Sequence, residues 1–119
     1  MNTMYSITEY NSVQILTVNS LLDEWQNRQI LKELDQKINF QNNPLIINLN
    51  QLALINSIGL NFLLSILSRV HKKNGQLILT NVSRRVQRML DITKLTSVFV
   101  LKPTVEQAVE NFSLELEVV

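Results

Sequence analysis

Short apolar runs alternate along this chain with longer segments of helical periodicity, and that alternation limits the possible folds more than any other feature. The clearest run, Leu45-Ile46-Ile47-Asn48-Leu49, is nearly unbroken and is typical of a strand buried on both faces. Gln76-Leu77-Ile78-Leu79-Thr80 repeats the pattern, and Ser97-Val98-Phe99-Val100-Leu101 is the last candidate. Near the start, residues 5–9 and 13–18 flank Asn11-Ser12, which predicts an opening hairpin.

The segments between these strands have helical spacing. Residues 22–38 predict a first helix with Ser20 as its cap, and Asp23 and Glu24 fall in its first turn. A second helix is expected over residues 60–70, a short third after Ser83, and a fourth after Lys102-Pro103-Thr104. Strands that alternate with helices predict an α/β fold with the middle strands parallel. Weak alternation in residues 113–119 indicates a frayed tail.

Composition limits the class of protein. The 119 residues suit one domain, 1–119, with 45% apolar and 18% charged residues. A net charge of +1 gives no global field to hold nucleic acid or an anionic membrane, so we expect no direct nucleic-acid contact. The chain has no cysteine, no signal-peptide pattern at its start, and no apolar stretch near the roughly 20 residues of a membrane span. We therefore expect a cytoplasmic protein without membrane insertion.

Three loops are expected to share one edge of the sheet, because the carboxyl ends of parallel strands gather there. They hold residues 20–23, Asn56-Ser57, and residues 81–83. Ser57 stands directly before the second helix, where unpaired N–H groups and the positive end of the helix dipole favour a phosphate. Spacing alone leaves a more ordinary alternative, in which Ser57 simply caps the helix.

The run Asn56-Ser57-Ile58-Gly59-Leu60 resembles the Asp-Ser-Ser-Gly-Leu motif of STAS domains of the anti-sigma factor antagonist type. The preceding run 45–49 and the downstream stretch 74–83 resemble that family's central strand and its glycine, strand and capping serine. Asp23 matches a family acidic residue at the start of the first helix. The resemblance implies a single bacterial STAS-like domain with a mixed sheet of about five strands and about four helices.

The same resemblance implies a function. Ser57 would be phosphorylated by an anti-sigma factor serine kinase, and a phosphatase would be a further partner. The unmodified form would bind the anti-sigma factor and free the sigma factor for transcription, and the phosphorylated form would release it. By this match the partner-binding residues are Asp23, Asn56, Ser57, Ile58, Gly59 and Asn81.

Two positions depart from the motif: Asn56 replaces an aspartate and Ile58 replaces the second serine. They keep open an alternative, a STAS interaction subunit that is not phosphorylated and belongs to another signalling complex or to a lipid-transport complex. A detached transporter-end domain is disfavoured by the start at Met1 and by the lack of spanning helices.

An enzyme is not expected, and neither a cofactor nor a metal is implied. A nucleophilic Ser57 would need a base within hydrogen-bond reach, and His71, the single histidine, lies far along the same helix. Gly59 serves either close approach by a kinase or tight packing. The helical spacing of Trp25 with Leu22 favours core packing. The alternative is an exposed position near Asp23, where Trp25 would anchor a partner. The arginines of residues 84–88 favour a solvated basic helix face over the alternative, a contact with nucleic acid or an acidic partner.

Overall fold

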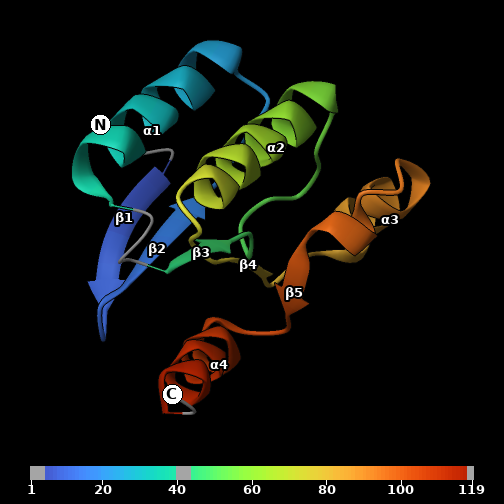
Figure 1. Cartoon of the computed structure of the whole chain (residues 1–119). Helices are drawn as coiled ribbons and strands as arrows, with labels where there is room; N and C mark the ends of the chain where they lie inside the picture. The colour runs from blue at the N-terminus through green and yellow to red at the C-terminus, as the bar shows by residue number, and fades with distance from the viewer. Residues whose placement is uncertain (1–4, 40–43, 118–119) are drawn as a thin grey trace.

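The computed structural model describes residues 5–39 and 44–117, and it forms a five-stranded sheet with four helices (Figure 1). This confirms the predicted single α/β domain with a mixed sheet. The elements in chain order are β1 (Tyr5–Tyr10), β2 (Val13–Val18), α1 (Glu24–Lys37), β3 (Leu45–Asn48), α2 (Ser57–Lys72), β4 (Leu77–Thr80), α3 (Arg84–Ile92), a 3-10 turn (Thr96–Val98), β5 (Val100–Lys102) and α4 (Val105–Glu117).

The strands lie side by side in the order of the sequence, β1-β2-β3-β4-β5. β1 and β2 are antiparallel and joined by the predicted turn, in which Asn11 and Ser12 both have positive φ, 51° and 66°. Two such residues match the twist of a two-residue hairpin, and asparagine tolerates this conformation well. β2 to β5 are parallel, as the helical crossovers require.

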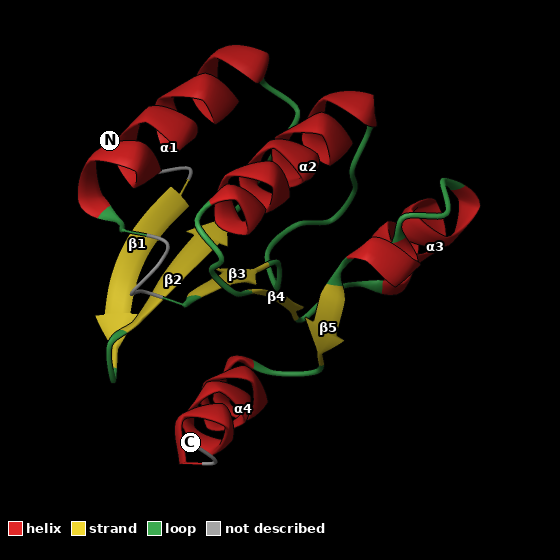
Figure 2. Ribbon diagram, in the orientation of Figure 1, coloured by secondary structure: helices red, strands yellow, loops and turns green. Residues whose placement is uncertain are grey.

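The two faces of the sheet are covered by different helices (Figures 1 and 2). α1 and α2 lie side by side over one face, and the core there includes Leu16, Ile47 and Leu79 together with Val86 and Leu90 of α3. α4 covers the other face. Its buried residues pack against alternate positions of the same strands, and this second cluster comprises Val13, Ile46, Ile78, Ala108, Val109 and Phe112. Strand side chains on both faces of the sheet are therefore buried, which explains the unbroken apolar runs.

The first helix begins differently from the prediction. The cap of α1 is Asp23, not Ser20: its Oδ1 accepts from the N–H groups of Trp25 at 2.9 Å and Gln26 at 3.2 Å. The Ser20 hydroxyl accepts from the Leu22 N–H, which closes a turn before the helix. A carboxylate at this position is favoured by the helix dipole, so it displaces serine.

The last strand begins three residues later than the sequence predicts and ends one residue later, at Val100–Lys102. Residues 96–98 form a 3-10 turn, and pairing with β4 begins at Val100 opposite Ile78. The Thr96 hydroxyl donates to the Asp91 carboxylate, which holds this segment against the end of α3. The tail expected to fray, residues 113–119, has helical backbone through Glu117, and residues 118–119 lie outside the described residues.

We predict that Tyr5→Phe lowers the free energy of unfolding by about 1 kcal/mol at neutral pH, because the Tyr5 hydroxyl donates to Glu33 of α1. That hydrogen bond, and then Lys37, hold the pKa of Glu33 below its ordinary value of 4.5. The stabilisation is complete above the unfolded pKa and is lost as the pH falls through the folded pKa. Urea unfolding at a series of pH values measures both effects.

Tyr10→Phe is the matched control, since the Tyr10 side chain is exposed at the hairpin. A Tyr5→Phe protein whose loss of stability stays the same when Glu33 is protonated would contradict this prediction.

Candidate functional site

The carboxyl ends of β2, β3 and β4 meet at one edge of the sheet, as the sequence predicts. Backbone and side-chain hydrogen bonds hold this edge together: the Leu49 N–H donates to the Thr80 carbonyl at 2.9 Å, and Asn81 Nδ2 donates to Asn48 Oδ1 at 2.9 Å. Asn81 adopts a positive φ of 55° there. Its amide therefore fixes the ends of β3 and β4, and the side chain is half-buried.

Ser57 is the first residue of α2, and Asn56 is the cap. Asn56 Oδ1 accepts from the N–H groups of Ile58 at 3.0 Å and Gly59 at 3.2 Å. The interpretation of Ser57 as the cap is therefore wrong. Its side chain is exposed, and its hydroxyl makes no hydrogen bond with any residue that the structure describes.

The electrostatic setting of this hydroxyl favours added negative charge. It stands at the positive end of α2, whose first turn has no acidic residue and whose last turn carries Arg69, His71 and Lys72. Asn56 supplies a neutral amide, which leaves the dipole uncompensated where an aspartate would offset part of it. A phosphate on Ser57 would consequently meet partial positive charge from its own helix.

Gly59 lies where the loop before α1 packs against the first turn of α2. It is buried, and a Cβ placed on it would lie 2.6 Å from Ile55 Cγ1 and 3.1 Å from Leu21 Cβ. Of the two uses considered for this glycine, the structure shows tight packing. Leu21 is itself fully buried, so the loop before α1 is pressed against the first turn of α2.

The predicted partner-binding residues are not equally accessible. Asp23, Asn56 and Ser57 are exposed, and the Leu21–Gly59 contact brings the loop of Asp23 against the helix of Ser57. Ile58 is half-buried. Gly59 and the half-buried Asn81 act through the shape of the edge rather than by presenting a reactive side chain.

Trp25 lies on the surface, contrary to the prediction that it packs in the core: 69% of it is exposed. The buried residues of α1 are Asn27, Ile30 and Leu34, and Trp25 lies roughly 200° around the helix from Asn27 at about 100° per residue. Leu22 and Leu54 are also exposed apolar residues of the loops at this edge. We call Leu22, Trp25 and Leu54 the apolar rim.

Two helix amides that the sequence did not single out hold the loop before α1. Asn27 Nδ2 donates to the Leu21 carbonyl at 3.0 Å, and Gln26 Nε2 donates to the Ser20 carbonyl at 3.0 Å. Asn27 is buried, with 4% exposed. A polar residue two positions from Trp25 carries no sequence signal for burial, so only the structure identifies this support.

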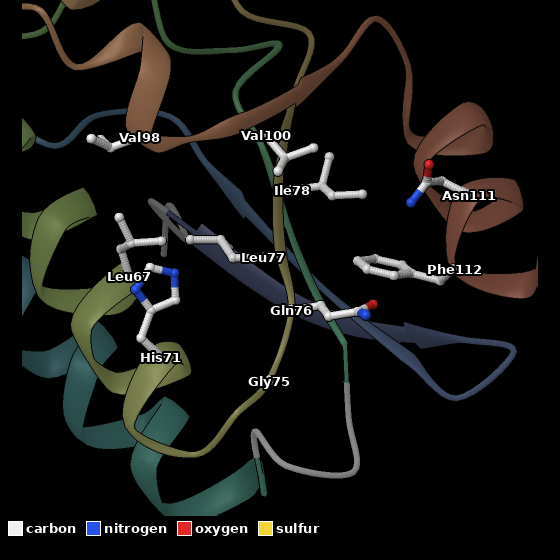
Figure 3. A pocket seen from close by; sticks show the side chains of 10 residues that line it. All are labelled: Leu67, His71, Gly75, Gln76, Leu77, Ile78, Val98, Val100, Asn111 and Phe112. Carbon is white, nitrogen blue, oxygen red and sulfur yellow. The ribbon is translucent and has the colours of Figure 1, made fainter. Parts of the chain in front are cut away.

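A separate hollow of about 210 Å³ opens at the other end of the sheet, before β4 (Figure 3). It lies between the last turns of α2, the edge strand β5 and α4, and its lining includes Leu67, His71, Val98, Val100 and Phe112. The exposed His71 is at one side of it, as expected for a residue near the end of α2. None of the predicted site residues lines this hollow.

Within residues 5–39 and 44–117, no group of three or more histidine or carboxylate side chains is arranged to hold a metal ion. No helix in this part of the chain is long and apolar enough to cross a membrane.

Comparison with known proteins adds a family and a fold. The family model for the STAS domain matches residues 4–108, whereas no curated protein sequence matches the chain. A STAS-domain anti-sigma-factor antagonist protein from Planctomyces limnophilus has 15% identity and a TM-score of 0.80, with 92% of this chain and 97% of that chain covered.

Two further solved structures resemble the chain. The unphosphorylated anti-sigma factor antagonist SpoIIAA has 20% identity and a TM-score of 0.75, covering 92% of this chain and 96% of that one. SpoIIAA is also found in phosphorylated form, where it is described as a Bacillus cell fate determinant. RsbS of Moorella thermoacetica, in a serine-to-glutamate variant, has 12% identity and a TM-score of 0.78, covering 97% and 99%. At such identities the similarity is one of fold.

We predict that Asn56→Ala lowers the free energy of unfolding by about 1 kcal/mol, because two N–H groups of α2 lose their acceptor. Ser57→Ala is the matched control and should change stability by less than about 0.5 kcal/mol, since its hydroxyl makes no internal hydrogen bond. Chemical denaturation measures both. Equal losses in the two variants would show that Ser57 shares the capping role.

Proposed function

The chain belongs to the STAS domain family, and from that premise we propose that it is an anti-sigma factor antagonist controlled at Ser57. In its unmodified form it binds an anti-sigma factor of the serine kinase type and so frees a sigma factor. Phosphorylation of Ser57 by that kinase releases the complex, and a phosphatase restores the binding form. The protein itself performs no catalysis in this scheme.

The exposed, unpaired hydroxyl of Ser57 is the observation that supports this proposal most strongly. A kinase needs an acceptor hydroxyl that it can reach and that is not already engaged in holding the fold. Asn56 performs the capping, so Ser57 meets both conditions. Its place at the amino end of α2 also suits the phosphorylated product, which gains partial positive charge from the helix.

The apolar rim supplies a contact surface that phosphorylation can disrupt. Leu54 is three positions before Ser57 in the chain, and Leu22 and Trp25 follow Leu21, which touches Gly59. Exposed aromatic residues of this kind often anchor partner proteins. A phosphate would add about −1.5 to −2 charges beside this surface, which disfavours an apolar partner by desolvation and an acidic one by repulsion.

A catalytic role for Ser57 has little support from the positions of the side chains. His71 lies about 21 Å further along α2, at about 1.5 Å per residue. An imidazole at that distance cannot take the serine proton. The hydroxyl is therefore better placed as the acceptor of a partner's phosphoryl group than as a nucleophile of its own.

A second candidate rests on Asn56 and Ile58, the two departures from the family motif. Asparagine caps a helix as well as aspartate does, so this change keeps the local fold while it removes a carboxylate beside the acceptor. A chain of that kind would serve as an unphosphorylated interaction subunit of another signalling complex or of a lipid-transport complex. In that case Ser57→Asp would capture the same proteins from a lysate as Ser57→Ala does.

We predict that incubation with ATP and the serine kinase recovered on Ser57→Ala bait adds one phosphate to the wild-type chain and none to Ser57→Ala. Intact-mass spectrometry measures the addition. Ser68→Ala, an exposed serine of the same helix, is the matched control and should still gain one phosphate. A phosphate that persists in Ser57→Ala would overturn the acceptor assignment.

A further inference from the structure

A groove of about 490 Å³ lies between the β1–β2 hairpin and α4, on the face of the sheet opposite α1 and α2. Its lining includes the apolar side chains of Ile15, Val105 and Val109. Tyr10 stands at the hairpin end of the groove with 59% of its surface exposed. An apolar hollow beside an exposed aromatic ring is suited to receive another apolar side chain.

Two glutamates give this groove its charge. Glu106 and Glu110 line it, both are exposed, and their spacing of one helical turn places them on the same side of α4. Neither forms an ion pair with any residue that the structure describes. Like charges one turn apart repel each other, so a cation between them would relieve that repulsion.

Helix α3 presents a surface of matching chemistry. Its buried side is formed by Val86 and Leu90, which pack on the sheet face covered by α1 and α2. An adjoining side carries four residues at i, i+3, i+4, i+7 spacing, which we call the α3 stripe: Arg85, Arg88, Met89 and Ile92.

Most side chains of the α3 stripe are exposed. Ile92 is 68% exposed, and both arginines are exposed and have no carboxylate partner among residues 5–39 and 44–117. Met89 is half-buried between these exposed residues and the core. The stripe therefore offers an exposed aliphatic side chain with one cation a helical turn away, Arg88, and a second cation two turns away, Arg85.

We propose that the groove of one molecule binds the α3 stripe of a second copy of this chain. Ile92 enters the apolar hollow beside Tyr10, and the arginines reach Glu106 and Glu110. The spacing of the two arginines matches that of the two glutamates. The arginines are three residues apart and the glutamates four, and both separations correspond to about 5–6 Å on a helix. The contact covers exposed apolar residues on both partners and neutralises both charged pairs.

The contact is head to tail. The stripe and the groove belong to helices that cover opposite faces of the sheet, so one molecule can use both at once (Figure 1). A contact between two different surfaces produces rings or open chains rather than a two-fold dimer. It involves neither Ser57 nor the apolar rim, so assembly leaves the proposed switch surface accessible.

The test is sedimentation velocity of the full-length chain over a range of concentrations. We expect reversible association that weakens by roughly tenfold or more between about 50 mM and 500 mM NaCl, because the charged pairs are screened. Glu106→Arg with Glu110→Arg, the groove variant, reverses the charge of the groove. Ile92→Asp replaces the apolar side chain of the stripe with a carboxylate. Each variant should be monomeric with an unchanged circular dichroism spectrum.

Mixing the two variants makes the test specific to this geometry. The groove variant keeps an intact stripe and Ile92→Asp keeps an intact groove, so an equimolar mixture should form a 1:1 complex and nothing larger. Gln29→Asp, at an exposed position of α1 that belongs to neither surface, is the control and should associate as the wild type does.

Three results would overturn the proposal: a wild-type chain that is monomeric at low salt, association that persists in either variant, or a mixture that stays monomeric. If the groove variant does not fold, Glu106→Gln with Glu110→Gln takes its place under the same criteria.

Discussion

The amide oxygen of Asn56 accepts hydrogen bonds from two N–H groups in the first turn of α2, and the proposed use of this edge depends on that arrangement. The first N–H groups of a helix have no acceptor within the helix, so a side-chain acceptor at its start stabilises it. Because Asn56 provides it, the neighbouring serine has no structural task and can be modified without removing support from the helix. The departure from the family motif at this position thus preserves capping and changes only the charge beside Ser57.

The second constraint is the contact of Gly59 with Leu21 and Ile55. It presses the loop before α1 against the first turn of α2, while Asn27 and Gln26 tie the same loop to its own helix. Leu22 and Trp25 are consequently held on the surface at the same edge of the sheet as the acceptor serine. The groove under α4 lies on the other face of the sheet, so a partner at the switch and a second copy at the groove do not compete.

Much of the fold follows from local patterns. The apolar runs at 45–49 and 76–80 predicted the central parallel strands, and Asn11-Ser12 predicted a turn that does require positive φ at both positions. The exact start of the first helix did not follow, because Ser20 and Asp23 are both good caps and only the hydrogen bonds of the folded chain show that Asp23 takes this role. The exposed position of Trp25 did not follow either: once Asp23 sets the start of α1, Trp25 turns outward.

The sheet edge that holds Ser57 was predictable from chain order, whereas the burial of Gly59 and Asn27 depends on contacts between distant segments.

The most direct test is to measure two quantities on one phosphorylated preparation: the free energy of unfolding, and the affinity for the serine kinase that the unmodified chain captures. We predict that phosphorylation at Ser57 leaves the free energy of unfolding unchanged or slightly higher, since the added charge lies at the positive end of α2. The same phosphate should weaken partner binding by at least about tenfold, which corresponds to about 1.4 kcal/mol. Unchanged affinity, or a loss of stability that accounts for the release, would contradict the claim that Ser57 controls a contact surface rather than the fold.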